Sequence, residues 1–151
     1  MKILFLHGKE GRPDGTKPRF LIENGFEVKA PSLPKDDWQK SMDLAQAEFD
    51  DFSPQVVVGS SRGAAVGCYL KTGNVPKILI APAYKYFGDL ELLLNESSIV
   101  LHCKEDKIID FKHSEDLVKR FAVRLIACGE GHRMSDPEAL ATLLKALRGE
   151  L

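Results

Sequence analysis

The chain has 151 residues, of which 44% are hydrophobic and 28% charged, and its formal net charge is -1. This composition excludes a disordered or fibrous protein, and the charge provides no general attraction to nucleic acid or to an anionic membrane. From this charge we expect neither a nucleic-acid partner nor a membrane partner. The length predicts a single domain spanning residues 1–151.

The three cysteines, Cys68, Cys103 and Cys128, have spacings that match neither a zinc site nor a disulfide framework. All three lie in apolar stretches, so we expect them to be buried free thiols. The first residues form an apolar run that is too short for a signal peptide, and no segment reaches the roughly 20 apolar residues that span a bilayer. These features predict a cytoplasmic protein.

The first half of the chain alternates between predicted strands and helices. The apolar run Ile3–Leu6 indicates a strand that is buried on both faces. Arg19–Asn24 predicts a short helix that ends before a glycine, and Phe26–Ala30 predicts a second strand. Apolar residues at alternating steps of four and three residues predict a helix from Trp38 to Phe52.

The second half continues the alternation. Further strands are expected at Val56–Val58, Lys77–Ala81, Ser98–Cys103 and Val123–Ala127. Helices are expected from Gly63, over Lys112–Phe121 and from Ser135 onwards, where Ser135–Glu138 combines a capping box with an early proline. Six strands alternating with helices predict an α/β fold with a mostly parallel sheet and helices on both faces.

Ser61 stands at the centre of a G-x-S-x-G pattern, Gly59 to Gly63, between a predicted strand and a predicted helix. In such a strand-turn-helix unit the serine occupies a sharp turn that lifts its hydroxyl above the sheet. The glycines two residues before and after it allow the strand and helix backbones to pass closely. The pattern predicts a nucleophilic serine, and its alternative is a glycine-rich turn with a serine helix cap.

A serine nucleophile needs a histidine that takes its proton, and in this type of site the histidine comes last in the chain. His132 follows the last predicted strand, directly after Gly131, in a loop that can place an imidazole above the sheet. His113 lies on the exposed side of a predicted helix, and His102 ends a strand, where we expect it to pack locally. We therefore predict His132 as the base.

The carboxylate that orients the histidine is expected after the fifth strand, at the edge where the loops of an open α/β sheet carry function. Asp106 lies in this loop and is preferred to Glu105 and Asp110. Asp110 directly precedes a predicted helix and is placed to cap it. The predicted triad is therefore Ser61, Asp106 and His132.

Backbone N–H groups are expected to stabilise the negative charge that develops on the substrate oxygen. The predicted donors are the amides of Arg62, after the nucleophile, and Lys9, after the first strand. His7 and Gly8 in the same loop, and Tyr84 after the fourth strand, are expected to contact the substrate; Tyr84 and its neighbours Tyr86 and Phe87 could equally be packing residues. The Arg62 side chain either holds a neighbouring carboxylate, which we favour, or attracts an acidic substrate.

Taken together, these residues make the chain resemble the α/β-hydrolase superfamily, especially its small, lid-free, esterase-like bacterial members. The resemblance rests on Phe5–Gly8, Gly59–Gly63, Asp106 and the Gly131-His132 pair, and it covers nearly the whole chain. It implies a three-layer fold without a lid domain and a six-stranded sheet of order 2-1-3-4-5-6. It also implies that no metal or organic cofactor is needed.

The implied strand order reverses between the first and third strands, which is where open α/β sheets bind ligands. The topology therefore predicts that the Lys9 loop and Ser61 lie together. Residues Pro82–Ser97, where larger relatives carry a lid, have room for one short helix, so the site should be open.

The sequence thus predicts a serine hydrolase that cleaves a small ester or thioester, and amide cleavage would use the same constellation. Two other function classes remain open. One is a catalytically weak protein of the same fold that binds a ligand or signals. The other is a flavodoxin-like flavin or nucleotide binder, although neither glycine-rich phosphate-binding pattern is present.

Overall fold

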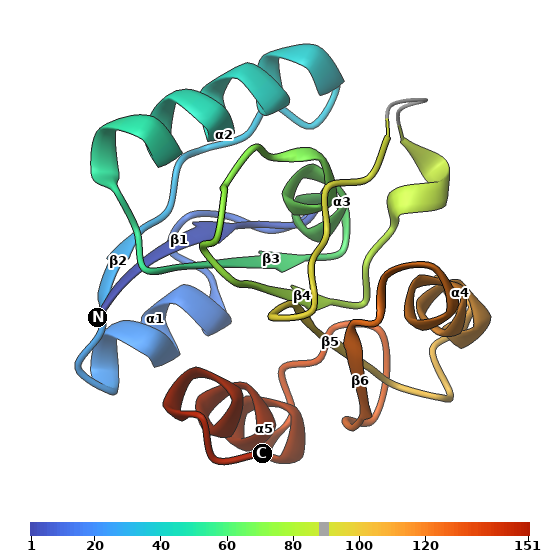
Figure 1. Cartoon of the computed structure of the whole chain (residues 1–151). Coiled ribbons are helices and arrows are strands. Elements are labelled where there is room, and N and C mark those ends of the chain that lie inside the picture. The colour runs from blue at the N-terminus through green and yellow to red at the C-terminus, as the bar shows by residue number, and fades with distance from the viewer. Residues whose placement is uncertain (88–90) are drawn as a thin grey trace.

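The computed structural model describes residues 1–87 and 91–151. Within these ranges six parallel strands form one sheet in the order β2-β1-β3-β4-β5-β6 (Figure 1). The strands are β1 (Lys2–Leu6), β2 (Glu27–Lys29), β3 (Val56–Ser60), β4 (Lys77–Ile80), β5 (Ile99–His102) and β6 (Arg124–Ala127). The helices are α1 (Thr16–Glu23), α2 (Trp38–Phe52), α3 (Arg62–Tyr69), α4 (Phe111–Phe121) and α5 (Pro137–Arg148), with a 3-10 turn at Tyr84–Tyr86. The predicted fold class and strand order are confirmed.

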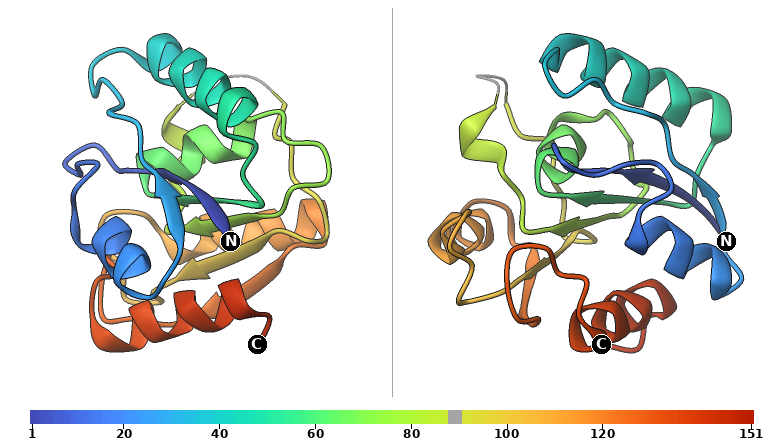
Figure 2. Two further views of the ribbon diagram at one scale, coloured as in Figure 1. Left: turned by 90° about the vertical axis from the view of Figure 1, so that its left-hand side faces the viewer. Right: turned by 180° about the vertical axis from the view of Figure 1, so that it is seen from behind.

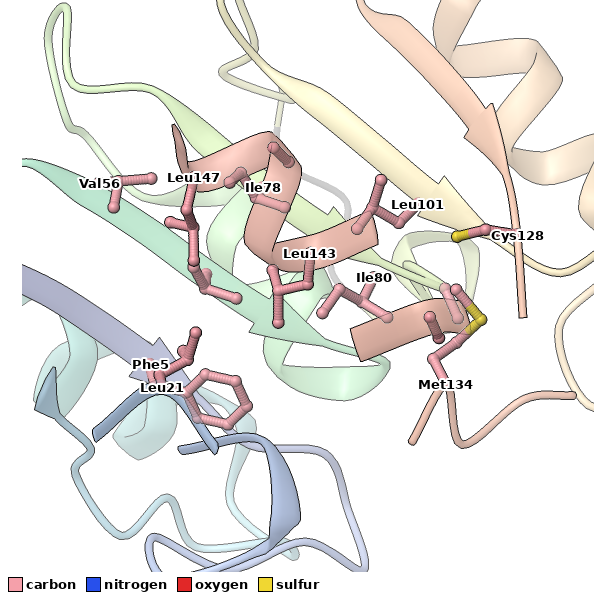
Figure 3. Close-up of a cluster of buried hydrophobic side chains, with 14 of the residues drawn as sticks. Phe5, Leu21, Val56, Ile78, Ile80, Leu101, Cys128, Met134, Leu143 and Leu147 are labelled. Atoms are coloured by element: carbon pink, nitrogen blue, oxygen red, sulfur yellow. The ribbon is translucent and has the colours of Figure 1, made fainter. Parts of the chain in front are cut away.

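Helices cover both faces of the sheet, as Figures 1 and 2 show. Helices α1 and α5 lie on one face, where Leu21 and Leu143 pack against side chains of the central strands (Figure 3). Helices α2, α3 and α4 cover the other face, where Ala64 and Leu117 belong to one apolar cluster. Because both faces are covered, β3 and β4 are buried at every position, which agrees with the apolar runs Val56–Val58 and Ile78–Ile80 within them.

The helix starts agree with the prediction at α4 and differ at α5. The carboxylate of Asp110 accepts a hydrogen bond from the N–H of Lys112 and caps α4, as expected. At α5 the cap is Asp136, which accepts from the N–H of Ala139 at 3.0 Å, and no capping box forms on Ser135. The reason is that the Glu138 carboxylate accepts from the N–H of Gly129 instead and holds the preceding loop.

The three cysteines are buried free thiols, as expected. Burial raises the pKa of the Cys68 thiol to about 12 and that of Cys128 to about 11. Because the thiolate is the reactive form of cysteine, these side chains act as small apolar core residues. Among the described residues, no helix has both the length and the apolar character needed to cross a membrane.

The loops that follow β1, β3, β5 and β6 share one edge of the sheet, because all strands run in the same direction. β1 and β3 are neighbours, with Leu6 paired to Gly59, so the segments after them start at the same level. Between β4 and β5 the described residues contain one 3-10 turn and no further helix. This edge therefore gathers the residues that the sequence analysis selected.

Candidate active site

Ser61 occupies a strained turn between β3 and α3. Its backbone has φ 54° and ψ -111°, a region that costs a non-glycine residue about 1–3 kcal/mol. The turn is held in place by the neighbouring strand β4 and by the segment after it: the Ser61 N–H donates to the Ile80 carbonyl at 2.8 Å, and the Ala83 N–H donates to the Ser61 carbonyl at 3.2 Å. The structure thus builds the sharp turn that the glycine pattern predicts.

The glycines on either side of Ser61 are required by close backbone packing. A Cβ atom at Gly63 would lie 2.0 Å from the carbonyl oxygen of Leu6 and 2.6 Å from that of His7. A Cβ atom at Gly59 would lie 2.6 Å from the Gly63 carbonyl oxygen. These contacts press α3 against the end of β1 and place Ser61 beside the loop that follows β1.

Ser61, His132 and Asp106 form a continuous hydrogen-bonded chain. The Ser61 hydroxyl donates to Nε2 of His132, with an Oγ–Nε2 distance of 2.9 Å. Nδ1 of His132 donates to Oδ2 of Asp106 at 2.7 Å. The structure therefore brings together the three predicted residues, which come from the loops after β3, β5 and β6, in the arrangement of nucleophile, base and orienting acid.

The Asp106 carboxylate is buried and accepts hydrogen bonds on both oxygens. Oδ1 accepts from the N–H groups of Ile108 at 2.8 Å and Ile109 at 2.9 Å, while Oδ2 accepts from His132 and from His102. Burial by itself would raise the pKa of this carboxyl, but the hydrogen bonds from Ile109, His132 and Ile108 outweigh it and hold the pKa below its ordinary value. Asp106 is therefore ionised at neutral pH.

His102 is a part of the site that the sequence analysis did not find. Its ring is fully buried, and Nε2 lies 3.0 Å from Oδ2 of Asp106 and 3.1 Å from the carbonyl oxygen of Ile109. Nδ1 lies 2.7 Å from the hydroxyl oxygen of Ser114. Burial lowers the pKa of His102, so the ring is neutral at pH 7. Because Nε2 faces two acceptors, it carries the proton, and Nδ1 accepts from Ser114.

The sequence contained only a weak indication of the contact between His102 and Asp106. A histidine at the end of an otherwise apolar strand must find a polar partner once the strand is buried. His102 and Asp106 are four residues apart, with the turn after β5 between them. The sequence did not show that this turn folds back over the histidine, so local packing was expected where a hydrogen bond to the acid occurs.

The loop that carries His132 is fixed by contacts from two helices. The Lys17 ammonium on α1 donates to the carbonyl of Arg133, and it donates to the Ser135 hydroxyl at 3.3 Å. At the start of α5, the Asp136 carboxylate accepts from the N–H of Glu130 at 3.0 Å. His132 is thus positioned by groups from both ends of the chain.

The loop after β1 is anchored by His7. Nε2 of this buried ring accepts from the Leu33 N–H at 2.9 Å, so the proton lies on Nδ1, which donates to the Gly8 carbonyl at 2.7 Å. The N–H of Gly11 also donates to the Gly8 carbonyl, which closes a turn with Lys9 at its second position. The Lys9 N–H is not used by this turn, and Arg62 begins α3, so its N–H has no acceptor within the helix. Both amides remain the predicted oxyanion donors.

The Arg62 side chain is structural, but its partner is not the expected carboxylate. The guanidinium is 2% exposed and donates to the Pro34 carbonyl at 3.0 Å and to the Ser41 hydroxyl at 3.1 Å. Its central carbon lies 5.5 Å from the ring centroids of both Trp38 and Phe87. Arg62 therefore ties α2 and the segment after β4 to the turn that holds Ser61.

A cavity of about 1000 Å³ opens at Ser61 and His132. His7, Gly8, Lys9 and Arg62 line it, and so do Tyr86 and Phe87. Tyr84 does not: its side chain is buried, and its hydroxyl donates to the His113 carbonyl at 2.8 Å. The expectation that Tyr84 contacts the substrate is corrected, because the 3-10 turn directs Tyr84 into the core, whereas Tyr86 and Phe87 reach the cavity.

In the described part of the chain, no three His, Cys, Asp or Glu side chains are grouped as metal ligands.

Solved structures share this architecture along almost the full chain. Alpha/beta hydrolase domain-containing protein 10 from mouse is 16% identical, with a TM-score of 0.79 over 98% of this chain and 88% of its own. A lid-free α/β serine hydrolase from Xanthomonas campestris is 15% identical, with a TM-score of 0.70 over 98% of this chain and 79% of its own. The chain has the α/β-hydrolase fold.

A third solved structure extends the likeness to a protein of similar size. The ydeN gene product from B. subtilis is 16% identical, with a TM-score of 0.72 over 97% of this chain and 98% of its own. No protein-family model matches the sequence, and no curated protein matches it significantly. At these identities the likeness concerns the fold, and the chemistry of the site has to be inferred from its own residues.

Proposed function

We propose that this α/β-hydrolase-fold protein is a serine hydrolase that cleaves a small ester or thioester through an acyl-enzyme on Ser61. The observation that carries the proposal is the hydrogen-bonded chain from Ser61 through His132 to Asp106, placed on a strained turn at the wall of an open cavity. A structural role alone would not explain why a buried carboxylate, an imidazole and a strained serine are lined up beside solvent-accessible space.

In the proposed mechanism, the Ser61 hydroxyl attacks the substrate carbonyl while Nε2 of His132 takes its proton. The imidazolium that forms is stabilised by Asp106, which stays ionised. The amides of Lys9 and Arg62 stabilise the oxyanion. His132 then returns the proton to the leaving alcohol or thiol, and water, activated by His132, releases the acyl group from Ser61.

The first test is turnover of p-nitrophenyl acetate and butyrate, together with labelling by a fluorophosphonate probe. We expect hydrolysis with an initial burst of nitrophenol and a probe adduct on the peptide that contains Ser61. Heat-denatured protein provides the control for nonspecific reaction. Folded protein that neither hydrolyses these esters nor reacts at Ser61 would refute the proposal and favour a ligand-binding protein of the same fold.

His102 is expected to act as a positioning residue in this mechanism, because it holds the carboxylate that orients His132. We expect the His102→Leu substitution to lower kcat about 10- to 100-fold with little change in KM, since small displacements of reacting groups have effects of this size. Gln can place an N–H close to the position of Nε2, so His102→Gln should recover most of the loss. Equal activities for the two variants would show that the hydrogen bond to Asp106 does not matter for the reaction.

The proposed cellular location is the cytoplasm. All three cysteines are free and buried, and reduced thiols are typical of proteins from reducing compartments.

A further inference from the structure

The cavity at Ser61 has a strongly positive lining, although the chain as a whole carries a formal net charge of -1. Five basic side chains line it in addition to buried Arg62, against one acidic side chain, Glu10. We call these five the basic group: Lys9, Arg12, Lys17, Arg19 and Arg133. They come from the loop after β1, from the first turn of α1 and from the loop that carries His132, so their gathering depends on the tertiary fold.

Most of the basic group has no negative partner. Arg12 forms an exposed ion pair with Asp14, with 3.5 Å between Nε and Oδ1. For Lys9, Lys17, Arg19 and Arg133 the structure shows no ion pair with any described residue. Positive charges that are not paired within the protein create a potential that attracts anions into a cleft.

Lys17 is the strongest indication that this positive charge is built into the site. The residue is 9% exposed, and its ammonium is held by the Arg133 carbonyl and the Ser135 hydroxyl, two neutral groups. Burial, followed by the positive charge of Arg133, lowers the pKa of Lys17 to about 8, and Asp136 opposes this only in part. Holding two like charges together beside the nucleophile costs stability, and a bound anion would relieve that repulsion.

A second part of the same cavity is apolar. Tyr86 and Ile108, which are 60% and 65% exposed, line it together with Phe87 and Ile109. Apolar side chains that gather in one cavity together with a few polar groups are typical of the lining of a ligand site. The cavity therefore offers an apolar surface and a positive surface within reach of Ser61.

We infer that the substrate is an ester or thioester with an apolar part and an anionic group, a carboxylate or a phosphate, in its acyl or its alcohol portion. This inference rests on the proposed function for the role of Ser61, and it adds the substrate class. The apolar part contacts Tyr86 and Ile108, and the anion lies among Lys9, Lys17 and Arg133. The exposed members of the basic group attract the anion towards the cavity.

The test compares substrates that differ in charge and little else. On the acyl side, the mono-4-nitrophenyl ester of adipic acid is compared with 4-nitrophenyl hexanoate. On the alcohol side, 4-acetoxybenzoate is compared with 4-acetoxybenzamide, and each kcat/KM is divided by the rate constant for uncatalysed hydrolysis. We expect the anionic member of at least one pair to be preferred by about tenfold or more in low salt, and less so in 0.5 M NaCl.

Arg133→Gln provides the variant and Arg148→Gln the matched control. Both changes remove one arginine charge. Arg133 is exposed at the cavity, while Arg148 ends α5 outside the cavity lining, so the two variants differ in where the charge is lost. We expect Arg133→Gln to reduce the preference for the anionic ester at least about threefold, and Arg148→Gln to leave it unchanged. Equal or better turnover of the neutral ester in both pairs would overturn the inference while leaving the proposed hydrolase intact.

Binding is measured in parallel by isothermal titration, so that the recognition of an anionic group by the cavity is judged even if no ester is hydrolysed. The ligands are 4-phenylbutyrate, phenyl phosphate and uncharged 4-phenylbutan-1-ol. Tighter binding of either anion than of the alcohol, weakened by Arg133→Gln, supports the inference, and the better anion identifies the charged group. Binding that does not depend on charge would overturn it.

Discussion

Replacing Ser61 with alanine is expected to lower kcat/KM for p-nitrophenyl butyrate by about 10³-fold or more, because the nucleophile is lost. His132→Ala should produce a loss of the same order, since Nε2 of His132 is the group that accepts the Ser61 proton. The double variant should be no slower than either single variant. Residues that act as one unit in a covalent mechanism show this strong lack of additivity.

The control for these variants is their stability. Both side chains lie at the cavity wall, and alanine at position 61 keeps a Cβ atom, so we expect thermal unfolding close to that of the wild type. Losses that multiply in the double variant would mean that Ser61 and His132 act independently, which is incompatible with the proposed acyl-enzyme. Unchanged rates in both variants would place the reaction elsewhere in the molecule.

Gly63→Ala is expected to cause the largest loss of stability of any single methyl addition near the site. The new Cβ would lie 2.0 Å from the Leu6 carbonyl oxygen, which belongs to a buried central strand and cannot move aside as a flexible side chain could. Relieving this clash requires α3 to shift away from β1. We expect the free energy of unfolding to fall by about 4 kcal/mol or more, in the range reserved for severe steric disruption.

Thermal unfolding followed by circular dichroism measures this effect, and Gly131→Ala is its control. No heavy atom lies within 4 Å of a Cβ built at Gly131, and its φ is not in the left-handed region, so this variant should melt within a few degrees of the wild type. We expect Gly63→Ala to lower Tm by at least about 10 °C or to be recovered unfolded. Equal melting temperatures would show that α3 and β1 can separate enough to admit a methyl group at little cost.

Local features of the sequence were enough to predict the fold and the main site residues. The continuous apolar run Ile3–Leu6 in β1 indicated a strand covered on both faces, since such a strand has no solvent-facing side that would require polar residues. Ser61 was found because a strained strand-to-helix turn requires glycines at fixed positions. Asp106 and His132 followed from chain order, because loops at the carboxyl ends of parallel strands share one edge.

Where a side chain's role depended on distant segments, the sequence was less informative. The Ser135–Glu138 pattern predicted a capping box, but Glu138 bonds the N–H of Gly129 and leaves the cap to Asp136. The sequence does not distinguish the role of Tyr84 from that of Tyr86, since both are tyrosines in the same segment. The 3-10 turn directs Tyr84 into the core and leaves Tyr86 exposed at the cavity. Propensity and spacing describe what a segment can do, while the neighbouring segments decide which of its options is realised.

The sequence by itself determined the alternation of strands and helices and the identity of Ser61, Asp106 and His132 as candidates, because hydrophobic patterns, short-range backbone requirements and chain order specify them. The order of the strands was implied by the resemblance to α/β hydrolases. Only the tertiary structure decided that His102 supports Asp106 and that Lys17 meets Arg133 at the cavity. Lys17 and Arg133 are 116 residues apart, so no local pattern could reveal their contact. The positive charge of the cavity likewise comes from residues of segments that are distant in the sequence, and only folding brings these segments together.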